Sequence, residues 1–225
     1  MAGTMVKFPS NGRQTDGYLA TPASGRGPGI VVIQEWWGLV DHIKDVADRF
    51  ASEGFVALAP DLYAGKTTKE PDEAGKLMMS MQMDTAAKDL SGAVSYLRDS
   101  SAADPKKVGT VGFCLGGGLS LFLATITPVD ACVIYYGVLP GAQPDLSKLR
   151  CPVLGHYAEH DEFASPEKAR ALESEIRGGG RQVEFHIYNG TSHAFFNDTR
   201  ADVYNEAAAK QSWDRTLAFF RQQLT

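Results

Sequence analysis

Short runs of β-branched and other apolar residues alternate with longer segments of helical period along most of this chain. This alternation predicts a parallel sheet with helices on both faces, because parallel strands need a long connection between them. After an N-terminal hairpin of Met5–Phe8 and Tyr18–Ala20, the expected strands are Gly29–Gln34, Phe55–Ala59, Lys107–Phe113, Ala131–Tyr136, Pro152–Tyr157 and Val183–Tyr188. The expected helices are Asp41–Glu53, Thr85–Arg98, Leu115–Thr125, Pro166–Arg177 and Val203–Gln223. We therefore expect one α/β domain over residues 1–225, built on an open, mostly parallel sheet.

The longest stretch without an expected strand is Ala64–Met83, which contains four methionines near its end. Methionine side chains adapt to irregular gaps in apolar packing. The segment is interpreted either as a flexible lid or as an extra helix that packs beside the sheet.

Charge and cysteine content narrow the class of protein. The 225 residues include 22 Lys and Arg against 27 Asp and Glu, a net charge of −5, which argues against nucleic acid as the main partner. The three cysteines are too few and too widely spaced for a disulfide framework, as in proteins of reducing compartments. No secretory signal pattern is visible, and no apolar run approaches the ~18 residues of a membrane helix. We expect a cytoplasmic protein without membrane or nucleic-acid partners, and a monomer by default.

The most informative segment for chemistry surrounds Cys114. An expected strand leads into an expected helix through a turn with Gly112 and Gly116 two residues on either side of the cysteine. This is the pattern of a nucleophile elbow, in which small neighbours permit a strained backbone that exposes the nucleophile at the carboxyl edge of the sheet. The first turn of the following helix, with the N–H of Leu115, would favour both a thiolate and a developing oxyanion.

A structural alternative exists for the same glycines. Gly112, Gly116 and Gly118 also fit a phosphate-binding loop of some dinucleotide enzymes. The loop lies in mid-chain and not after the first strand, and no Tyr-x-x-x-Lys occurs, so we favour the elbow. Cys132 and Cys151 lie in or beside apolar strands and are interpreted as ordinary core residues.

A nucleophilic thiol needs a base and a group that orients the base. Acidic residues follow the strand that ends at residue 157, and His193 follows the strand that ends at residue 188, so the chain order nucleophile, acid, histidine is that of α/β-hydrolases. We favour Asp161 as the acid because its side chain is short and stiff, although Glu159 and Glu162 compete. His193 is preferred as the base because it lies in a loop, whereas His186 lies within a strand and His42 at a helix start.

One metal-binding pattern is set aside. His156 and His160 form an H-x-x-E-H motif, which would bring two histidines to one zinc ion on a helix. The segment continues an expected strand, and a rise of roughly 3.3 Å per residue would separate the two side chains by about 13 Å. We therefore expect no metal site.

With these candidates in place, the sequence from about Gly17 to its C-terminus resembles the dienelactone hydrolase (carboxymethylenebutenolidase) family, which has an α/β-hydrolase fold. The segments that carry the resemblance are Gln34-Glu35-Trp36-Trp37-Gly38-Leu39, Ala59-Pro60-Asp61-Leu62-Tyr63, Gly112-Phe113-Cys114-Leu115-Gly116-Gly117 and Ser192-His193-Ala194-Phe195. The resemblance implies that Glu35 hydrogen-bonds or deprotonates Cys114 and moves when substrate arrives. It also implies an oxyanion hole made by the backbone N–H groups of Trp36 and Leu115.

The substrate pocket departs from the family pattern. Well-studied members hold a substrate carboxylate with two arginines, but no arginine lies between Arg49 and Arg98, and the position four after His193 is Asn197. Arg200 or a lysine could substitute, although a lysine does not reproduce a bidentate clamp. Tyr135 matches a tyrosine that lines the family pocket, or it is a core aromatic of its strand. Trp37 and Phe195, with Trp36, suggest an apolar and roomy pocket.

The sequence thus predicts a hydrolase of activated, small-molecule esters or lactones that needs no cofactor. Cys114 would be the nucleophile, His193 the base and acid, Asp161 the orienting group and Glu35 the activator, with an acyl-cysteine intermediate. One alternative is a general carboxylesterase or thioesterase without a carboxylate clamp. Another is a protein that is not an enzyme and uses Cys114 as a reactive thiol.

Overall fold

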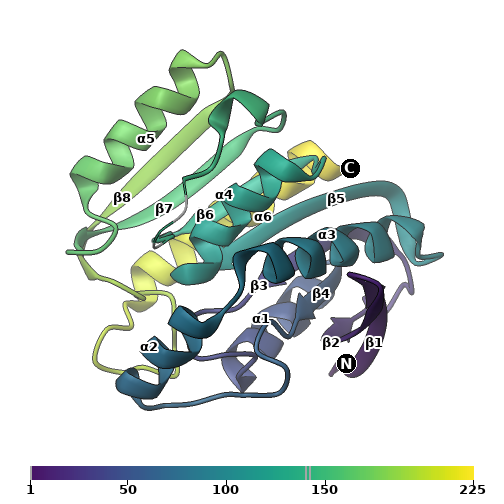
Figure 1. Ribbon diagram of the computed structural model, residues 1–225. Coiled ribbons are helices and arrows are strands. Elements are labelled where there is room, and N and C mark those ends of the chain that lie inside the picture. Colours follow the sequence, from purple (N-terminus) through teal and green to yellow (C-terminus); the bar gives the residue numbers. More distant parts are fainter. Residues whose placement is uncertain (1, 140, 142) are drawn as a thin grey trace. The chain divides into compact units, whose positions relative to one another are not determined.

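The computed structural model describes residues 2–139, 141 and 143–225, and this part of the chain forms an eight-stranded sheet with six α-helices (Figure 1). The strands are β1 Thr4–Ser10, β2 Arg13–Ala20, β3 Gly27–Ile33, β4 Val56–Pro60, β5 Ala103–Phe113, β6 Ala131–Tyr135, β7 Val153–His160 and β8 Val183–Ser192. The helices are α1 Asp41–Ser52, α2 Pro71–Ser80, α3 Met83–Asp99, α4 Leu115–Ile126, α5 Pro166–Gly178 and α6 Glu206–Leu224, with a short 3-10 turn at Leu146–Lys148. The chain divides within β5 into two compact units, residues 1–110 with 224–225 and residues 111–223.

In the first unit the strand order is β1-β2-β4-β3-β5. The pairs β1/β2 and β2/β4 are antiparallel, whereas β3 and β4 are parallel. Every residue of β3 and β4 is buried, as expected for strands covered on both faces, and helices α1 and α3 pack on them. The hairpin turns at Asn11-Gly12, where both residues have positive φ, the geometry that joins two strands with the twist of a sheet.

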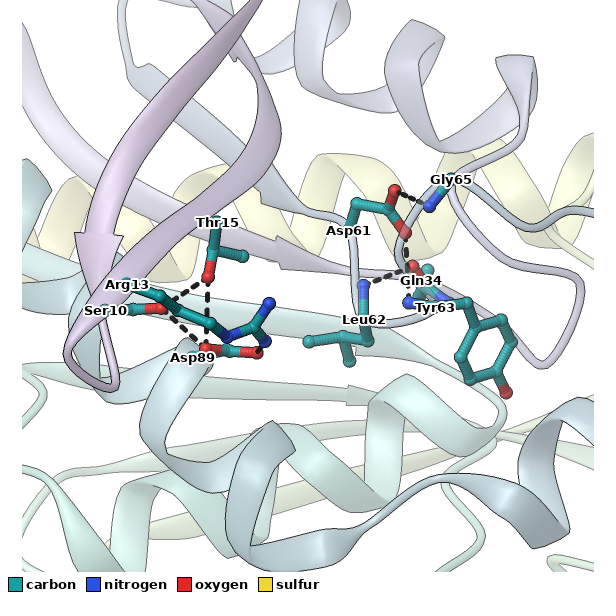
Figure 2. Close-up of polar contacts among 9 residues, drawn as sticks. All are labelled: Ser10, Arg13, Thr15, Gln34, Asp61, Leu62, Tyr63, Gly65 and Asp89. Carbon is teal, nitrogen blue, oxygen red and sulfur yellow. Dashed lines mark hydrogen bonds and ion pairs between the residues drawn. The ribbon is translucent and has the colours of Figure 1, made fainter.

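A buried carboxylate ties the hairpin to α3 in this unit (Figure 2). Asp89 accepts hydrogen bonds from the Ser10 hydroxyl at 2.6 Å and the Thr15 hydroxyl at 3.1 Å. Arg13 forms an ion pair with the other carboxylate oxygen at 2.6 Å. Because the Asp89 side chain is only 3% exposed, these partners supply the polar contacts that water would otherwise give.

In the second unit β6, β7 and β8 pair in parallel, in that order after the end of β5. Helix α5 lies along β7 and β8 (Figure 1). Ser165 is its N-cap residue, and the Ser165 hydroxyl accepts a hydrogen bond from the N–H of Lys168. Pro166 occupies the first turn, where its missing N–H costs nothing. Helix α4 packs on β6, and because β6, β7 and β8 are parallel their carboxyl ends lie at the same edge of the sheet.

The fold class predicted from the sequence is confirmed, and each expected strand and helix is present with shifted ends. Segment 64–83 contains helix α2, which covers 10 of its 20 residues, so the expected extra helix is present, whereas the lid stays a prediction. Strand β5 starts at Ala103, four residues before the expected Lys107, and α6 starts at Glu206 and not at Val203. In the part of the chain that the structure describes, none of the helices is long and apolar enough to cross a membrane. The single domain stays a prediction.

Candidate active site

The backbone at Cys114 has the strained geometry of an elbow. Cys114 joins β5 to α4 with φ 55° and ψ −116°, a conformation that residues with a side chain rarely adopt. A Cβ on Gly112 would lie 1.9 Å from the carbonyl oxygen of Gly116, so only glycine fits there. The Cys114 N–H donates to the carbonyl of Tyr135 at 3.1 Å, and its carbonyl accepts from Gly117 and Val138, both at 3.0 Å. These contacts hold the strained residue in place and leave its side chain partly exposed.

His193 and Asp161 come from two neighbouring parallel strands. Asp161 follows the last residue of β7, and His193 follows the last residue of β8. The imidazole Nδ1 lies 2.7 Å from Asp161 Oδ2, and the Asp161 side chain is fully buried. Its second oxygen, Oδ1, accepts hydrogen bonds from the N–H groups of Phe163 and Ala164, both at 2.9 Å. The carboxylate is therefore fixed on both sides.

The competing acids have other positions. Glu159 accepts a hydrogen bond from the Gly190 N–H at 2.7 Å and lies 3.4 Å from His160 Nε2. Among the acids considered from the sequence, Asp161 is the one that pairs with His193.

The histidine is held in its protonated form. Burial favours the neutral imidazole and alone would lower the pKa of His193, but hydrogen bonds with Asp161 and with the Cys114 side chain outweigh it and raise the pKa to about 10. Burial acts to raise the pKa of Asp161, whereas the hydrogen bond and charge of His193 lower it, and the net pKa is below its usual range. Because Nδ1 faces Asp161, the remaining nitrogen, Nε2, is the one that meets the thiol. Residues 114, 161 and 193 thus form one connected chain of polar contacts.

Two aromatic residues that the sequence reading did not single out flank the imidazole. The ring centroid of Tyr136 lies 5.0 Å from that of His193, and the centroid of Phe163 lies 5.6 Å from it. Tyr136 is fully buried and has φ 38°, immediately after the end of β6. Phe163 is 66% exposed. Each lies within two residues of a predicted site residue, Phe163 of Asp161 and Tyr136 of Tyr135, and this proximity was the signal available for finding them.

The predicted residues before Cys114 belong to the first unit. Glu35 follows β3 and is buried, while Trp36 and Trp37 are half-buried and pack edge to face at 4.9 Å. The side-chain oxygen of Gln34 accepts the Leu62 N–H, and Asp61 accepts from Tyr63 and Gly65 (Figure 2). The Gln34–Leu62 hydrogen bond thus joins the loop after β3 to the loop after β4, and the Asp61 bonds hold the second loop itself.

The other residues expected to line a pocket have mixed positions. Tyr135 is fully buried and its hydroxyl hydrogen-bonds to Thr216 at 2.8 Å, while Phe195 is fully buried against Tyr136 and Tyr188. Both contribute packing around the site. Arg200 is partly exposed and forms an ion pair with Asp202 at 2.7 Å.

The H-x-x-E-H motif lies in β7, as the sequence predicts. His156 is fully buried and its two nitrogens contact the hydroxyls of Tyr188 at 2.9 Å and Thr216 at 3.0 Å. His160 is exposed on the same strand, so the two histidines have separate partners.

Comparisons with known proteins identify the family and the fold. The sequence pattern of the "Dienelactone hydrolase family" matches residues 15–224. "Protein usf" of Aquifex pyrophilus is 42% identical, with 99% of this chain and all of that protein covered. A "Putative carboxymethylenebutenolidase" of Aquifex aeolicus is 37% identical over 99% of each chain. The crystal structure of a "Putative Dienelactone Hydrolase" from Klebsiella pneumoniae superimposes with a TM-score of 0.89 at 30% identity, covering 98% of each chain. The chain therefore belongs to the dienelactone hydrolase family and is a hydrolase with the α/β-hydrolase fold.

Proposed function

We propose that this protein hydrolyses activated carboxylic esters or lactones through an acyl-cysteine intermediate. The observation that carries the proposal is the connected chain from Cys114 through His193 to Asp161, in which a partly exposed thiol meets an imidazole that a buried carboxylate holds protonated. A protonated imidazole beside a thiol favours the thiolate, which is the nucleophilic form.

In the proposed reaction the Cys114 sulfur attacks the acyl carbon and forms a C–S bond. His193 then gives its Nε2 proton to the leaving oxygen as the C–O bond breaks. In the second half, His193 takes a proton from a water molecule that attacks the thioester, and the C–S bond breaks to release the acid and regenerate the thiolate. Asp161 does not change its charge; it keeps Nε2 directed at the sulfur.

Stabilisation of the tetrahedral oxyanion is assigned to backbone donors. Leu115 is the first residue of α4, where helix N–H groups lack a partner within the helix and the dipole favours negative charge. Its N–H is one proposed donor and that of Trp36 the other, as the family resemblance implies. The same resemblance is the basis for Glu35 as the group that activates Cys114.

The nucleophile restricts the substrate. A thiolate is a better leaving group than an ordinary alkoxide, so the tetrahedral intermediate of an unactivated ester would expel sulfur and return to substrate. An enol or phenol oxygen is a better leaving group than an ordinary alkoxide and so competes better with the thiolate for departure from the intermediate. Enol-lactones and aryl esters therefore suit this site, in keeping with the carboxymethylenebutenolidase name of the Aquifex aeolicus relative.

One observation favours a second candidate, an esterase that does not require a carboxylate on its substrate. Arg200, one of the residues considered as a replacement for a missing clamp arginine, already pairs with Asp202 at 2.7 Å. A substrate carboxylate would have to compete with this partner. Inhibition by small dicarboxylates would support a carboxylate-binding pocket, and its absence would support the second candidate.

The test compares wild type with Cys114→Ala and Cys114→Ser on p-nitrophenyl acetate and an enol-lactone. Cys114→Ala should lose turnover while its far-UV circular dichroism and thermal unfolding stay unchanged. Mass spectrometry of quenched wild type should show an acetyl group on the peptide that contains residue 114. Cys151→Ala, which removes a buried thiol, is the matched control and should keep its activity. Equal rates for Cys114→Ala and wild type would refute the proposal.

A further inference from the structure

The aromatic ring of Phe163 stands out because it is exposed while its backbone is fixed. Its side chain is 66% exposed. Its N–H donates to Asp161 Oδ1 at 2.9 Å, and its carbonyl accepts a hydrogen bond from the Lys168 ammonium, also at 2.9 Å. The loop between β7 and α5 therefore presents an apolar ring to solvent from a restrained position.

The ring is exposed next to the group that is proposed to move the proton. The centroids of Phe163 and His193 are 5.6 Å apart with the planes at 69°, an edge-to-face contact. The ring of Tyr136 also contacts this imidazole, with the two centroids 5.0 Å apart, but Tyr136 is fully buried. Of these two rings, Phe163 is the exposed one and can still receive another molecule.

The position of the leaving group follows from the proton transfer. The leaving oxygen must come within about 2.6–3.2 Å of His193 Nε2 to receive its proton. Since the Phe163 ring packs against that imidazole, we expect the carbon atoms attached to the leaving oxygen to come close to this ring. A flat, conjugated group can stack on it or meet its edge, whereas a small saturated group gains less contact.

We propose that Phe163 is a specificity-determining residue that receives the departing alcohol portion of the substrate and favours flat aryl or enol leaving groups over saturated ones. The inference rests on the proposed function, and it adds the side of the site on which the substrate is selected. It gives Phe163 no part in proton transfer.

A structural role for the same ring makes a different prediction. If Phe163 only kept the imidazole in place, its loss would slow the hydrolysis of every substrate by one common factor and would shift the pH profile of kcat. A binding surface for the leaving group instead produces a loss that depends on the leaving group and leaves the pH profile unchanged.

The experiment uses three acetyl esters that differ only in the leaving group: phenyl acetate, vinyl acetate and 2,2,2-trifluoroethyl acetate. Wild type, Phe163→Ala, Phe163→Leu and Phe163→Tyr are compared by kcat/KM for each ester. Phe163→Ala should lower kcat/KM for the phenyl ester by about 3- to 10-fold, the range of a single aromatic contact, and leave the trifluoroethyl ester within about twofold. Phe163→Tyr should retain the wild-type preference, and Phe163→Leu should fall between.

The matched control is Ile126→Ala. Ile126 is also an exposed apolar residue, at 45%, but it is the last residue of α4, about 17 Å along that helix from the end that holds Cys114. It should leave all three rates unchanged. Because Phe163 is exposed, its variants should unfold at nearly the wild-type temperature, which the same samples can show.

The outcomes separate this inference from the proposed function. Equal losses for all three esters, or no loss, would overturn the role of Phe163 while Cys114→Ala remained inactive. If Cys114→Ala hydrolysed the esters as fast as wild type, the proposed function would fail, and the inference with it.

Discussion

Replacing Asp161 with asparagine tests the proposed chemistry with the smallest change of shape. Asp161 Oδ1 accepts the Phe163 and Ala164 N–H groups, so in Asp161→Asn the amide oxygen keeps that place and the NH₂ group faces His193. The imidazole Nδ1, which lies 2.7 Å from Oδ2 in the wild type, must then accept a hydrogen bond. Its proton moves to Nε2, which can no longer take a proton from the thiol.

The magnitude of this effect is set by the loss of the correct tautomer. In a related arrangement with a serine nucleophile the same change costs on the order of 10⁴ in kcat. We expect a loss of roughly 10³ to 10⁴ in kcat/KM on p-nitrophenyl acetate at pH 7.5, with less effect on KM. The pKa of His193, which is raised to about 10, should fall toward 6.5 once the carboxylate is gone.

Steady-state kinetics and an NMR titration of the His193 ring measure the two effects. Glu159→Gln is the matched control, because Glu159 lies two residues away and bonds to the Gly190 N–H instead of to the imidazole. It should keep wild-type rates. A loss below tenfold in Asp161→Asn, or an unchanged titration of His193, would refute the assigned role of the carboxylate.

Three further predictions concern stability. Because its pKa is raised in the folded protein, His193 adds to the free energy of unfolding below pH 6.5, and this contribution is lost as the pH rises toward about 10. Asp161, whose pKa is lowered, adds to the free energy of unfolding above pH 3.8, and this contribution is lost as the pH falls below that value. In urea denaturation the free energy of unfolding of wild type should therefore exceed that of Asp161→Asn by at most about 5 kcal/mol, and the difference should be largest between pH 4 and 6.5. A difference that grew toward pH 10 would contradict this prediction. Gly112→Ala, whose new Cβ would lie 1.9 Å from the Gly116 oxygen, should cost more than about 4 kcal/mol or prevent folding, and a wild-type melting temperature would show that the elbow can relax. Asp89→Ala removes three hydrogen-bonded contacts and should lower the free energy of unfolding by about 2–4 kcal/mol. Because these contacts are remote in sequence from Cys114, the folded variant should keep its kcat. A change in the free energy of unfolding below about 0.5 kcal/mol would contradict the prediction.

The strands of the sheet could be predicted because burial on both faces leaves a direct trace in the sequence. Strand β3 is buried at all of its positions, and its continuous Ile-Val-Val-Ile run predicts this burial. The start of β5 at Ala103 left no such trace, since Asp104 and the two lysines that follow are polar and exposed or nearly so. The expected hairpin strands were too short, because the Asn11-Gly12 hairpin signal was not used; the strands reach this turn, at Ser10 and Arg13.

The residues of the candidate site that depend on chain order and strand ends could be predicted from the sequence. Contacts that depend on the direction of a side chain could not. The sequence favoured Asp161 but left Glu159 and Glu162 as competitors, because all three lie close to the end of the same expected strand. In the structure Glu159 is still within β7 and bonds to Gly190, whereas Asp161 follows the strand and pairs with His193. Tyr135 and Tyr136 are neighbours with similar side chains, but only Tyr136 packs on His193, because β6 ends between them and the backbone turns to φ 38°.

The three cysteines differ in their surroundings, and this difference is why we propose reactivity for Cys114 and not for the other two. Burial raises the pKa of Cys132 well above its usual value, and burial raises that of Cys151 to about 12, so both stay neutral and inert in the core. Cys114 has no such enclosure: it is partly exposed, precedes the first turn of α4 and hydrogen-bonds to a protonated histidine. The strained φ of 55° is what brings its sulfur out of the sheet, and the glycine at position 112 is what permits that φ. The reactivity proposed for this thiol thus depends on a backbone conformation that Gly112 makes possible.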